Sequence, residues 1–321
     1  MAAEKTNISG MSKSSAKIIA DADEKENVII KNPLGDKRIG ISVSNSDEYK
    51  ELGFSENHQK DITIELTRYL LVNGAHLVYG GDLRKEGYTE LFSELSFQYR
   101  DKEEHSKIFF TNYFGWPIYN LLKNADEATY KRNRVEIIKC KPPTEVPKKL
   151  EKKFVEADTF KNRELWALSM SHMRNEMTKN TSARIFIGGV LSKYKGFYPG
   201  LVEEGALSLE ANKPIYLIGA FGGATNLMIR AIKGESEKKL VKEIFEWFPE
   251  LQELYNKVDE KTLTNNLNEI FKSFKKLGIK GLCKLNGLTK IENEALFSTT
   301  HFHEMIYIIL LGLKRTLKNS K

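Results

Sequence analysis

The sequence predicts an α/β fold, in which a doubly wound, Rossmann-like parallel sheet is followed by a C-terminal helical extension. Short apolar runs rich in β-branched and aromatic residues alternate with segments of helical spacing. This alternation is typical of βαβ units and of a parallel sheet covered on both faces. Every candidate strand ends in a glycine or hydroxyl loop, and from about residue 233 the pattern is wholly helical.

The same patterns divide the chain into three regions. Residues 1–36 are polar and small without a sustained period, and we expect a flexible leader. Residues 37–232 carry the alternating strands and helices of the Rossmann-like domain. Residues 233–321 are expected to form a helical cap or oligomerisation region packed on the sheet.

Individual elements follow from local signals. The first long helix opens at Ser55, a good N-cap, and closes at Gly74. Its predicted buried face consists of Ile62, Leu66, Tyr69, Leu70 and Asn73. The predicted strands cover 38–44, 75–79, 107–111, 185–187 and 214–218, with 135–140 as a further candidate. Other helices are expected from about 89, over 158–180 and 203–212, and then over 238–258, 261–277, after Thr289 and over 300–317, with loops at 112–117 and 278–287. Most of 124–157 shows no clear pattern.

Composition limits the classes of protein. The chain is 40% hydrophobic and 29% charged, and no apolar run reaches the 18 or more residues of a membrane span. Its N-terminus lacks the apolar segment of a secretory signal. Cys140 and Cys283 give neither a disulfide framework nor metal-ligand spacing, so we expect a reducing, cytoplasmic location. The net charge of +7 comes from lysines mixed with glutamates. An anionic small ligand explains it as well as nucleic acid does, and no nucleic-acid motif accompanies it.

The stretch 183–204 organises the chain. A predicted strand ends at Gly188–Gly189, a polar loop follows, and Pro199–Gly200 begins a helix that carries Glu203 and Glu204 near its start. A strand, a glycine loop and a helix N-terminus form a phosphate or sugar cradle, because free backbone amides meet the ligand there. The two glutamates equally fit simple capping of the helix dipole. The motif alone leaves both interpretations open.

Two motifs resemble the signature of LOG-type phosphoribohydrolases. In that family a His-Glu-Arg-Lys-x-x-Met helix precedes a strand and a Pro-Gly-Gly-x-Gly-Thr-x-x-Glu loop. The corresponding segments are 172–177, with Arg174 and Met177, and 184–204. Residues 41–44 resemble the first phosphate loop and residues 78–81 the second. The chain therefore resembles the SLOG superfamily (LOG and Smf/DprA-like proteins), and within it the branch associated with sirtuin and TIR domains in bacterial anti-phage defence. The features that suggest this branch are 79–84, 196–200, 219–223 and 286–289.

The resemblance implies a nucleotide-binding sensor. Its ligand would be an NAD-derived nucleotide such as ADP-ribose or a cyclic ADP-ribose isomer, with no required cofactor and no metal. Binding would control assembly, with a homo-oligomer expected, or a separate effector protein such as a sirtuin or TIR protein. No membrane partner is expected, and single-stranded DNA binding of the Smf/DprA type is the weakest alternative.

The resemblance also implies an enzymatic alternative, in which Arg174 and Glu204 would be catalytic. The chain would then be an N-glycosidase of the nucleotide phosphoribohydrolase or NAD glycohydrolase type. Against this, residues 190–198 are inserted between the glycines and Pro199, Leu201 replaces the family threonine, and Asn175 replaces the lysine. Because the binding frame is kept while the loop is altered, we favour sensing.

The candidate ligand-binding residues lie at the predicted strand ends and in the two motifs. They are Ser42, Ser44, Gly80, Gly81, Asp82, Arg84, Asn112, Trp116, Arg174, Gly188, Gly189, Lys193, Gly200, Glu203, Glu204, Gly222 and Gly223. Several have a structural alternative. Trp116 suits either base stacking or packing, and Asp82 suits either a ribose contact or an Asx turn. Arg84 and Lys193 suit either a phosphate contact or the surface.

Overall fold

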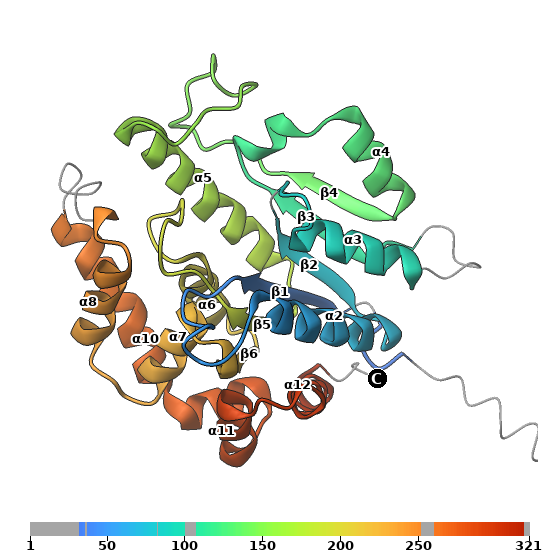
Figure 1. Ribbon diagram of the computed structural model, residues 1–321, viewed down its shortest axis with the longest axis vertical. Coiled ribbons are helices and arrows are strands. Elements are labelled where there is room, and N and C mark those ends of the chain that lie inside the picture. The colour runs from blue at the N-terminus through green and yellow to red at the C-terminus, as the bar shows by residue number, and fades with distance from the viewer. Residues whose placement is uncertain (1–31, 36, 82, 100–106, 252–259, 318–321) are drawn as a thin grey trace, which may run out of the picture. The chain divides into compact units, whose positions relative to one another are not determined.

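Six parallel strands form one sheet, which confirms the predicted α/β fold (Figure 1). The strands are β1 (Arg38–Ser44), β2 (His76–Gly80), β3 (Phe110–Phe114), β4 (Val135–Lys139), β5 (Ala183–Gly188) and β6 (Ile215–Ile218). Their order is β4-β3-β2-β1-β5-β6, so the chain builds outward from β1 to β4 and then returns to the other side of β1. This reversal between β1 and β5 is the topological switch point, where open α/β sheets bind their ligands.

The computed structural model describes residues 32–35, 37–81, 83–99, 107–251 and 260–317, with the backbone alone for 260–263. The fold lies within a unit that spans residues 33–321. Leu34, at the end of the predicted leader, is buried, and its amide donates to the Asn73 carbonyl at 2.9 Å. The rest of the predicted leader, apart from residues 32–35, lies outside the described residues.

Helices cover both faces of the sheet. One face carries α2 (Glu56–Val72), α3 (Tyr88–Gln98), α11 (Lys290–Ser298) and α12 (Phe302–Thr316). The other carries α5 (Phe160–Lys179), α6 (Gly200–Glu210), α7 (Gly223–Ile232) and α10 (Glu260–Asn286). The remaining elements are α8 (Glu237–Trp247), which packs on α7 and α10, α4 (Asn124–Arg132), which contacts β4, and the 3₁₀ turns Ile118–Leu121 and Gly219–Phe221. None of the described helices is long and apolar enough to cross a membrane.

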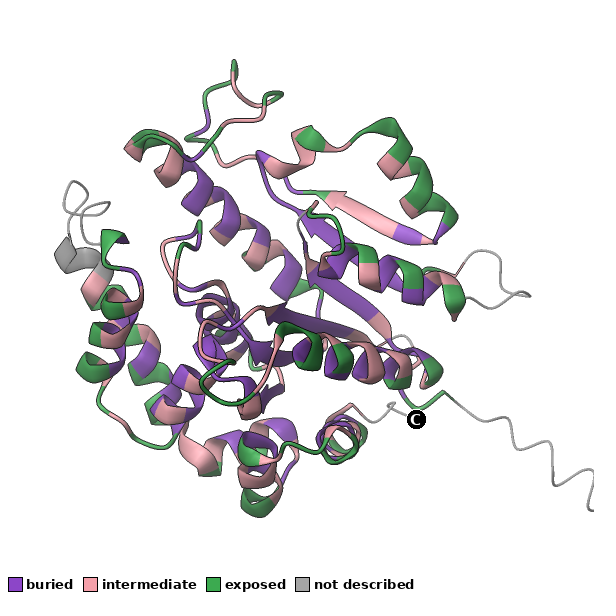
Figure 2. Ribbon diagram, in the orientation of Figure 1, coloured by how far each residue is buried: buried purple, intermediate pink, exposed green. Residues whose placement is uncertain are grey.

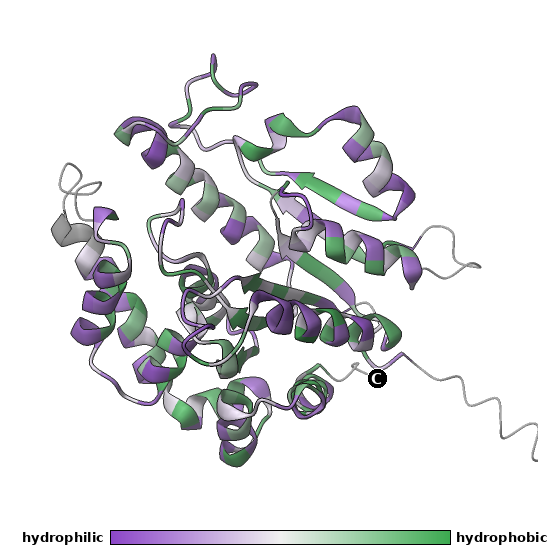
Figure 3. Cartoon of the chain, in the orientation of Figure 1, coloured by the Kyte–Doolittle hydropathy of each residue, from purple (hydrophilic) through white to green (hydrophobic). Residues whose placement is uncertain are grey.

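Side chains alternate across β1 as its sequence predicts. Ile39, Ile41 and Val43 join the core beneath α2, while Ser42 faces α6. The strands are largely buried, and the outer faces of the covering helices are exposed and mostly hydrophilic (Figures 2 and 3). Ser42 therefore lies on a buried face of the sheet, where a polar side chain needs a polar partner.

The first helix follows the prediction at both ends. Ser55 is its N-cap, and Gly74 follows the C-cap with φ 83°. Ile62, Leu66 and Leu70 are fully buried, as expected, but Tyr69 is 40% exposed. The buried face includes Leu70 and Leu71 instead, and Tyr69 lies at its border.

The third strand lies further along the chain than predicted. The expected strand was 107–111, whereas β3 runs from Phe110 to Phe114 and includes residues assigned to a loop. All five β3 residues are buried. Thr111 and Asn112 are tolerated there because each has a polar contact: Thr111 donates to Glu136 at 2.6 Å, and Asn112 accepts a long hydrogen bond from Thr89 at 3.4 Å. The polar residues Thr111 and Asn112 made this segment resemble a loop in the sequence, although it forms a buried strand.

Two C-terminal boundaries also differ. The predicted loop 278–287 is mostly helix, because α10 continues to Asn286 and only Gly278 departs from helical geometry (φ 57°, ψ 175°). Leu282, in the second part of α10, is fully buried, and this packing holds the helix beyond the kink. The helix expected over 238–258 ends as α8 at Trp247, shortly before a proline, and residues 252–258 lie outside the described residues.

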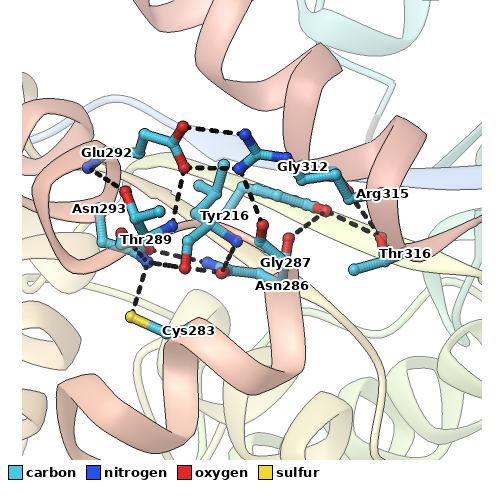
Figure 4. Close-up of polar contacts among 11 residues, drawn as sticks. Tyr216, Cys283, Asn286, Gly287, Thr289, Glu292, Asn293, Gly312, Arg315 and Thr316 are labelled. Carbon is cyan, nitrogen blue, oxygen red and sulfur yellow. Dashed lines mark hydrogen bonds and ion pairs between the residues drawn. The ribbon is translucent and has the colours of Figure 1, made fainter.

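A buried polar cluster joins the C-terminal helices to β6 (Figure 4). Asn286 donates to the carbonyl of Ile215 at 3.1 Å and to Asn293 Oδ1 at 2.8 Å. Tyr216 donates its hydroxyl to the Asn286 carbonyl at 3.1 Å, and Thr316 lies 3.2 Å from the same hydroxyl. Because Tyr216, Asn286 and Asn293 are buried and partnered, the cluster fixes α10, α11 and α12 against the sheet edge.

The kink at Gly278 gives a test of backbone strain. Gly278→Ala should lower the free energy of unfolding by about 1–3 kcal/mol, because φ 57° with ψ 175° is a region that only glycine adopts readily. A Cβ at this position would meet no atom within 4 Å, so a steric clash would not contribute. Gly281→Ala, in the helical part of α10, is the control and should not destabilise comparably. Equal urea midpoints for the two variants would contradict the strain.

Candidate functional site

Four chain segments meet at the switch point between β1 and β5. The loop after β1 contacts the loop after β5, since the amide of Gly189 donates to the Ser44 carbonyl at 2.9 Å and that of Val190 to the Ser44 hydroxyl at 3.1 Å. The start of α7 joins them, because the amide of Ala224 donates to the Gly189 carbonyl at 3.0 Å. The start of α6 lies against Arg174. The glycine loops predicted from the sequence are thus brought together.

Beneath these loops, Glu204 is held in a buried ionic group. Arg184 Nη1 lies 2.8 Å from Glu204 Oε2 and 3.1 Å from the hydroxyl of Ser42, which itself donates to Glu204. Arg184 also donates from Nη2 to the Thr178 hydroxyl at 3.1 Å. Arg184 is 1% exposed and Glu204 8%. Gly40, opposite Arg184 on β1, leaves the space that the guanidinium fills.

Arg174 and Glu203 form the second half of this group. Arg174 Nη1 donates to Glu203 Oε2 at 2.5 Å, and Ser171 donates to the other oxygen of Glu203. Arg174 Nε lies 3.7 Å from Glu204 Oε1 and has no hydrogen-bond partner among the described residues. A Cβ on Gly200 would lie 2.7 Å from Arg174 Nη2, so glycine is what lets the guanidinium reach the start of α6.

The ionic group is close to electrically balanced. Two guanidiniums face two carboxylates, and the four side chains lie at the interface of α5, α6, β1 and β5. Burial lowers the pKa of Arg184, and the neighbouring Glu204 carboxylate opposes that shift. Buried charges such as these remain favourable only while each keeps its opposite charge and its hydrogen-bond partners.

The loop between Gly189 and Pro199 binds a carboxylate with its backbone. Asp47 Oδ2 accepts from the amides of Leu191 and Ser192 at 2.7 and 3.1 Å, and Asp47 Oδ1 accepts from the Ser192 hydroxyl at 2.9 Å. Three donors converging on one carboxylate are the arrangement found in anion-binding nests. The residues inserted relative to the LOG pattern therefore hold the Asp47 carboxylate.

A second carboxylate occupies the start of α7. Glu48 Oε2 accepts from the amide of Gly223, the first residue of α7. Gly222 and Gly223 have φ of 66° and 63°, and a Cβ on Gly222 would meet Glu48 at 2.6 Å. Asp47 and Glu48 are only partly buried. Consecutive acidic residues thus hold two neighbouring positions where a helix N-terminus and a nest favour an anion.

Two buried amides lie beside the glycine loops. Gln59 donates to the Ser44 carbonyl at 2.8 Å, while its Oε1 has no hydrogen-bond partner among the described residues. A Cβ on Gly188, whose φ is 64°, would lie 2.6 Å from that oxygen. Asn112 is fully buried with Nδ2 unpartnered among the described residues, and it fills the space that Gly81 leaves.

Four other predicted residues, Gly80, Lys193, Trp116 and Arg84, make none of the contacts given above. Gly80 packs against Met173 and Met177 of α5, and Lys193 is exposed. Trp116 is fully buried, packs with Val146 and Leu165 and donates to the Leu150 carbonyl at 3.2 Å. Its ring is therefore part of the core. Arg84 is exposed and lines a separate cavity of about 620 Å³ between α3 and α4, and Asp82 lies outside the described residues.

Sequence reasoning missed four polar residues of this region: Arg184, Asp47, Glu48 and Gln59. Arg184 carried a signal, since an arginine within the otherwise apolar run 183–187 must be paired if that run is a buried strand. The acidic pair carried no comparable signal, because short acidic loops are usually solvated. Among the described residues, no group of three or more His, Cys, Asp or Glu side chains is placed to hold a metal ion.

The family of the chain follows from its match to a model of a known protein family. The model of SLOG cluster2 matches residues 33–296, most of the chain. The chain belongs to the SLOG cluster2 family. No curated protein shows significant similarity to the chain. Membership of a SLOG family indicates a nucleotide-related function, and the matched range includes every candidate site residue.

Proposed function

We propose that this SLOG cluster2 protein is a sensor that binds an NAD-derived, ADP-ribose-like nucleotide at the β1–β5 switch point. The observation that carries the proposal is the pair of carboxylates held by backbone amides, with Asp47 on Leu191 and Ser192 and Glu48 on Gly223. Donor groups that hold carboxylates in this way also suit phosphate oxygens.

The placement of the two carboxylates on consecutive residues favours a ligand with two linked anionic groups. Asp47 and Glu48 are consecutive, and the amides that they bind belong to loops joined through Gly189 and Ala224. A ligand with two linked anionic groups, such as a pyrophosphate, would replace both carboxylates with one molecule. Ribose hydroxyls would suit the carboxylates of the ionic group, because a carboxylate accepts hydroxyl protons well.

The balance of charges favours binding over hydrolysis. N-glycosidic cleavage passes through an oxocarbenium-like transition state, which an unneutralised carboxylate stabilises. Glu204 is paired with Arg184 at 2.8 Å, and Arg174 lies 3.7 Å away, so its charge is already compensated. The alternative, an N-glycosidase or ribosyltransferase acting on a nucleotide or NAD, rests on the proximity of Arg174 to Glu204.

The sensor would act through assembly or a separate effector. The resemblance to the sirtuin- and TIR-associated branch supports a role in bacterial anti-phage defence, in the cytoplasm, with a homo-oligomer or an effector protein as the responding partner. Displacement of Asp47 and Glu48 would free the loop after β1 as one unit. That change is a physical signal that a partner can recognise.

The test incubates the protein with NAD, ADP-ribose, cyclic ADP-ribose isomers and AMP, and follows each ligand by chromatography alongside a thermal shift. We expect intact ligand and a raised melting temperature for a diphosphate nucleotide, with little response to AMP. No shift with any of them would remove the sensor. Released base or nicotinamide that disappears in Glu204→Gln would establish the enzyme instead.

A further inference from the structure

A groove lies among α6, α10 and α12, away from the switch-point loops. Its volume is about 980 Å³, at the upper end of small-molecule sites. It is lined by the end of α6, the turn before β6, one face of α10 and the end of α12. The switch-point site uses the start of α6, whereas the groove uses Leu209 and Glu210 at its end, so the two are separate.

The floor of the groove is apolar. Leu209, Leu277, Leu285, Leu317 and Pro214 line it, and each is only half-buried. Gly281, in the middle of the α10 face, has no side chain to fill it. A Cβ placed there would lie 3.0 Å from Leu277 Cδ1 and 3.3 Å from Leu277 Cγ, so a side chain at this position would press against the groove floor.

The rim of the groove is basic. Lys276 and Lys284 are exposed and lie on either side of the kink at Gly278, and neither has an ion pair among the described residues. Glu210 is the acidic residue that lines the same groove. Arg315 is already engaged, since it pairs with Glu292 at 2.7 Å and donates to the Gly287 carbonyl at 3.0 Å (Figure 4). Two lysines therefore remain to attract an anionic group.

The walls of the groove are fixed before any ligand arrives. Gly287, Arg315 and Thr316 line it, and they belong to or adjoin the buried cluster around Asn286 and Tyr216. A preformed site loses little conformational freedom when it binds. The α10 residues that line it come from both sides of the kink at Gly278.

We propose that this groove binds a single-chain amphipathic anion. The apolar chain would lie over the leucines, and its carboxylate or phosphate head would sit between Lys276 and Lys284. This site is independent of the nucleotide proposal, because it shares no residue with the switch-point group.

The test titrates the full-length protein with submicellar tetradecanoate by calorimetry, with tetradecanol as the uncharged comparison. We expect micromolar binding of tetradecanoate and at least tenfold weaker binding of the alcohol. Lys276→Glu/Lys284→Glu should weaken tetradecanoate binding at least tenfold. Lys280→Glu, an exposed α10 lysine outside the groove lining, should not.

Gly281→Leu provides a test that does not depend on charge. The added side chain should fill the groove and abolish binding, while circular dichroism and the melting temperature confirm that the variant is folded. Unchanged binding in this variant, or no binding by the wild-type protein, overturns the proposal. Sedimentation is measured in parallel. An oligomer that dissociates in Gly281→Leu would show that a second copy of the chain covers the groove, which also overturns it.

Discussion

Arg184→Leu is expected to lower the free energy of unfolding by about 3–5 kcal/mol, the cost of leaving a buried charge without its partner. Arg184 is 1% exposed and holds both Glu204 and Ser42. Arg174 is 3.7 Å from Glu204 and offers only partial compensation. Urea denaturation followed by circular dichroism measures the change.

A double variant separates charge from packing. Arg184→Leu/Glu204→Leu removes both charges, so it should recover much of the lost stability, since a buried pair replaced by apolar residues is often close to neutral. Arg68→Leu breaks the exposed pair with Glu65 and should cost at most about 1 kcal/mol. If the double variant is less stable than Arg184→Leu, then the pair does not act as the geometry indicates.

Asp47→Asn/Glu48→Gln is expected to raise the affinity for a diphosphate nucleotide at least tenfold. The wild-type carboxylates compete with the ligand for the amides of Leu191, Ser192 and Gly223, and they also repel its phosphates. The neutral amides compete less strongly because they carry no charge. A tenfold gain corresponds to about 1.4 kcal/mol of binding free energy.

Fluorescence or calorimetric titration with ADP-ribose measures this gain. Glu51→Gln changes the charge of the same loop, and Glu51 is exposed, so this variant should leave the affinity nearly unchanged. A general charge effect would raise the affinity in both variants. Unchanged or weaker binding by the double variant would falsify internal competition and leave the carboxylates with a purely structural role.

The strands that frame the site were predictable because their signals are local. Apolar runs ending in glycine marked β2, β5 and β6, and an apolar run ending in hydroxyls marked β1. The parallel sheet then brought these strand ends to one edge. The start of α6 at Pro199–Gly200 was also predictable from proline's fixed φ. The register of β3 was not, because Thr111 and Asn112 lie in a buried strand only through side-chain contacts made in the folded state.

The chemistry of the site was less predictable than its frame. Glu203 and Glu204 were identified from the motif, but the sequence left capping and function equally open. The family resemblance already grouped Arg174 with Glu204, whereas the contacts of Arg184 with Glu204 and of Arg174 with Glu203 come only from the fold. The role of Asp47 depends on amides about 145 residues away. No local pattern reports such a contact, and the burial of Trp116 likewise depends on the packing of the segment around Val146 and Leu150.

The adjacency of Asp47 and Glu48 has a consequence for the logic of the proposed sensor. Two carboxylates on neighbouring residues would hold the same loop at two points, so the loop would be released only when both are displaced. A lone phosphate ion replaces one of them and leaves the other holding the loop in place. The domain would therefore behave as a coincidence detector, silent in the presence of abundant free phosphate and responsive only when two anionic groups arrive on the same molecule.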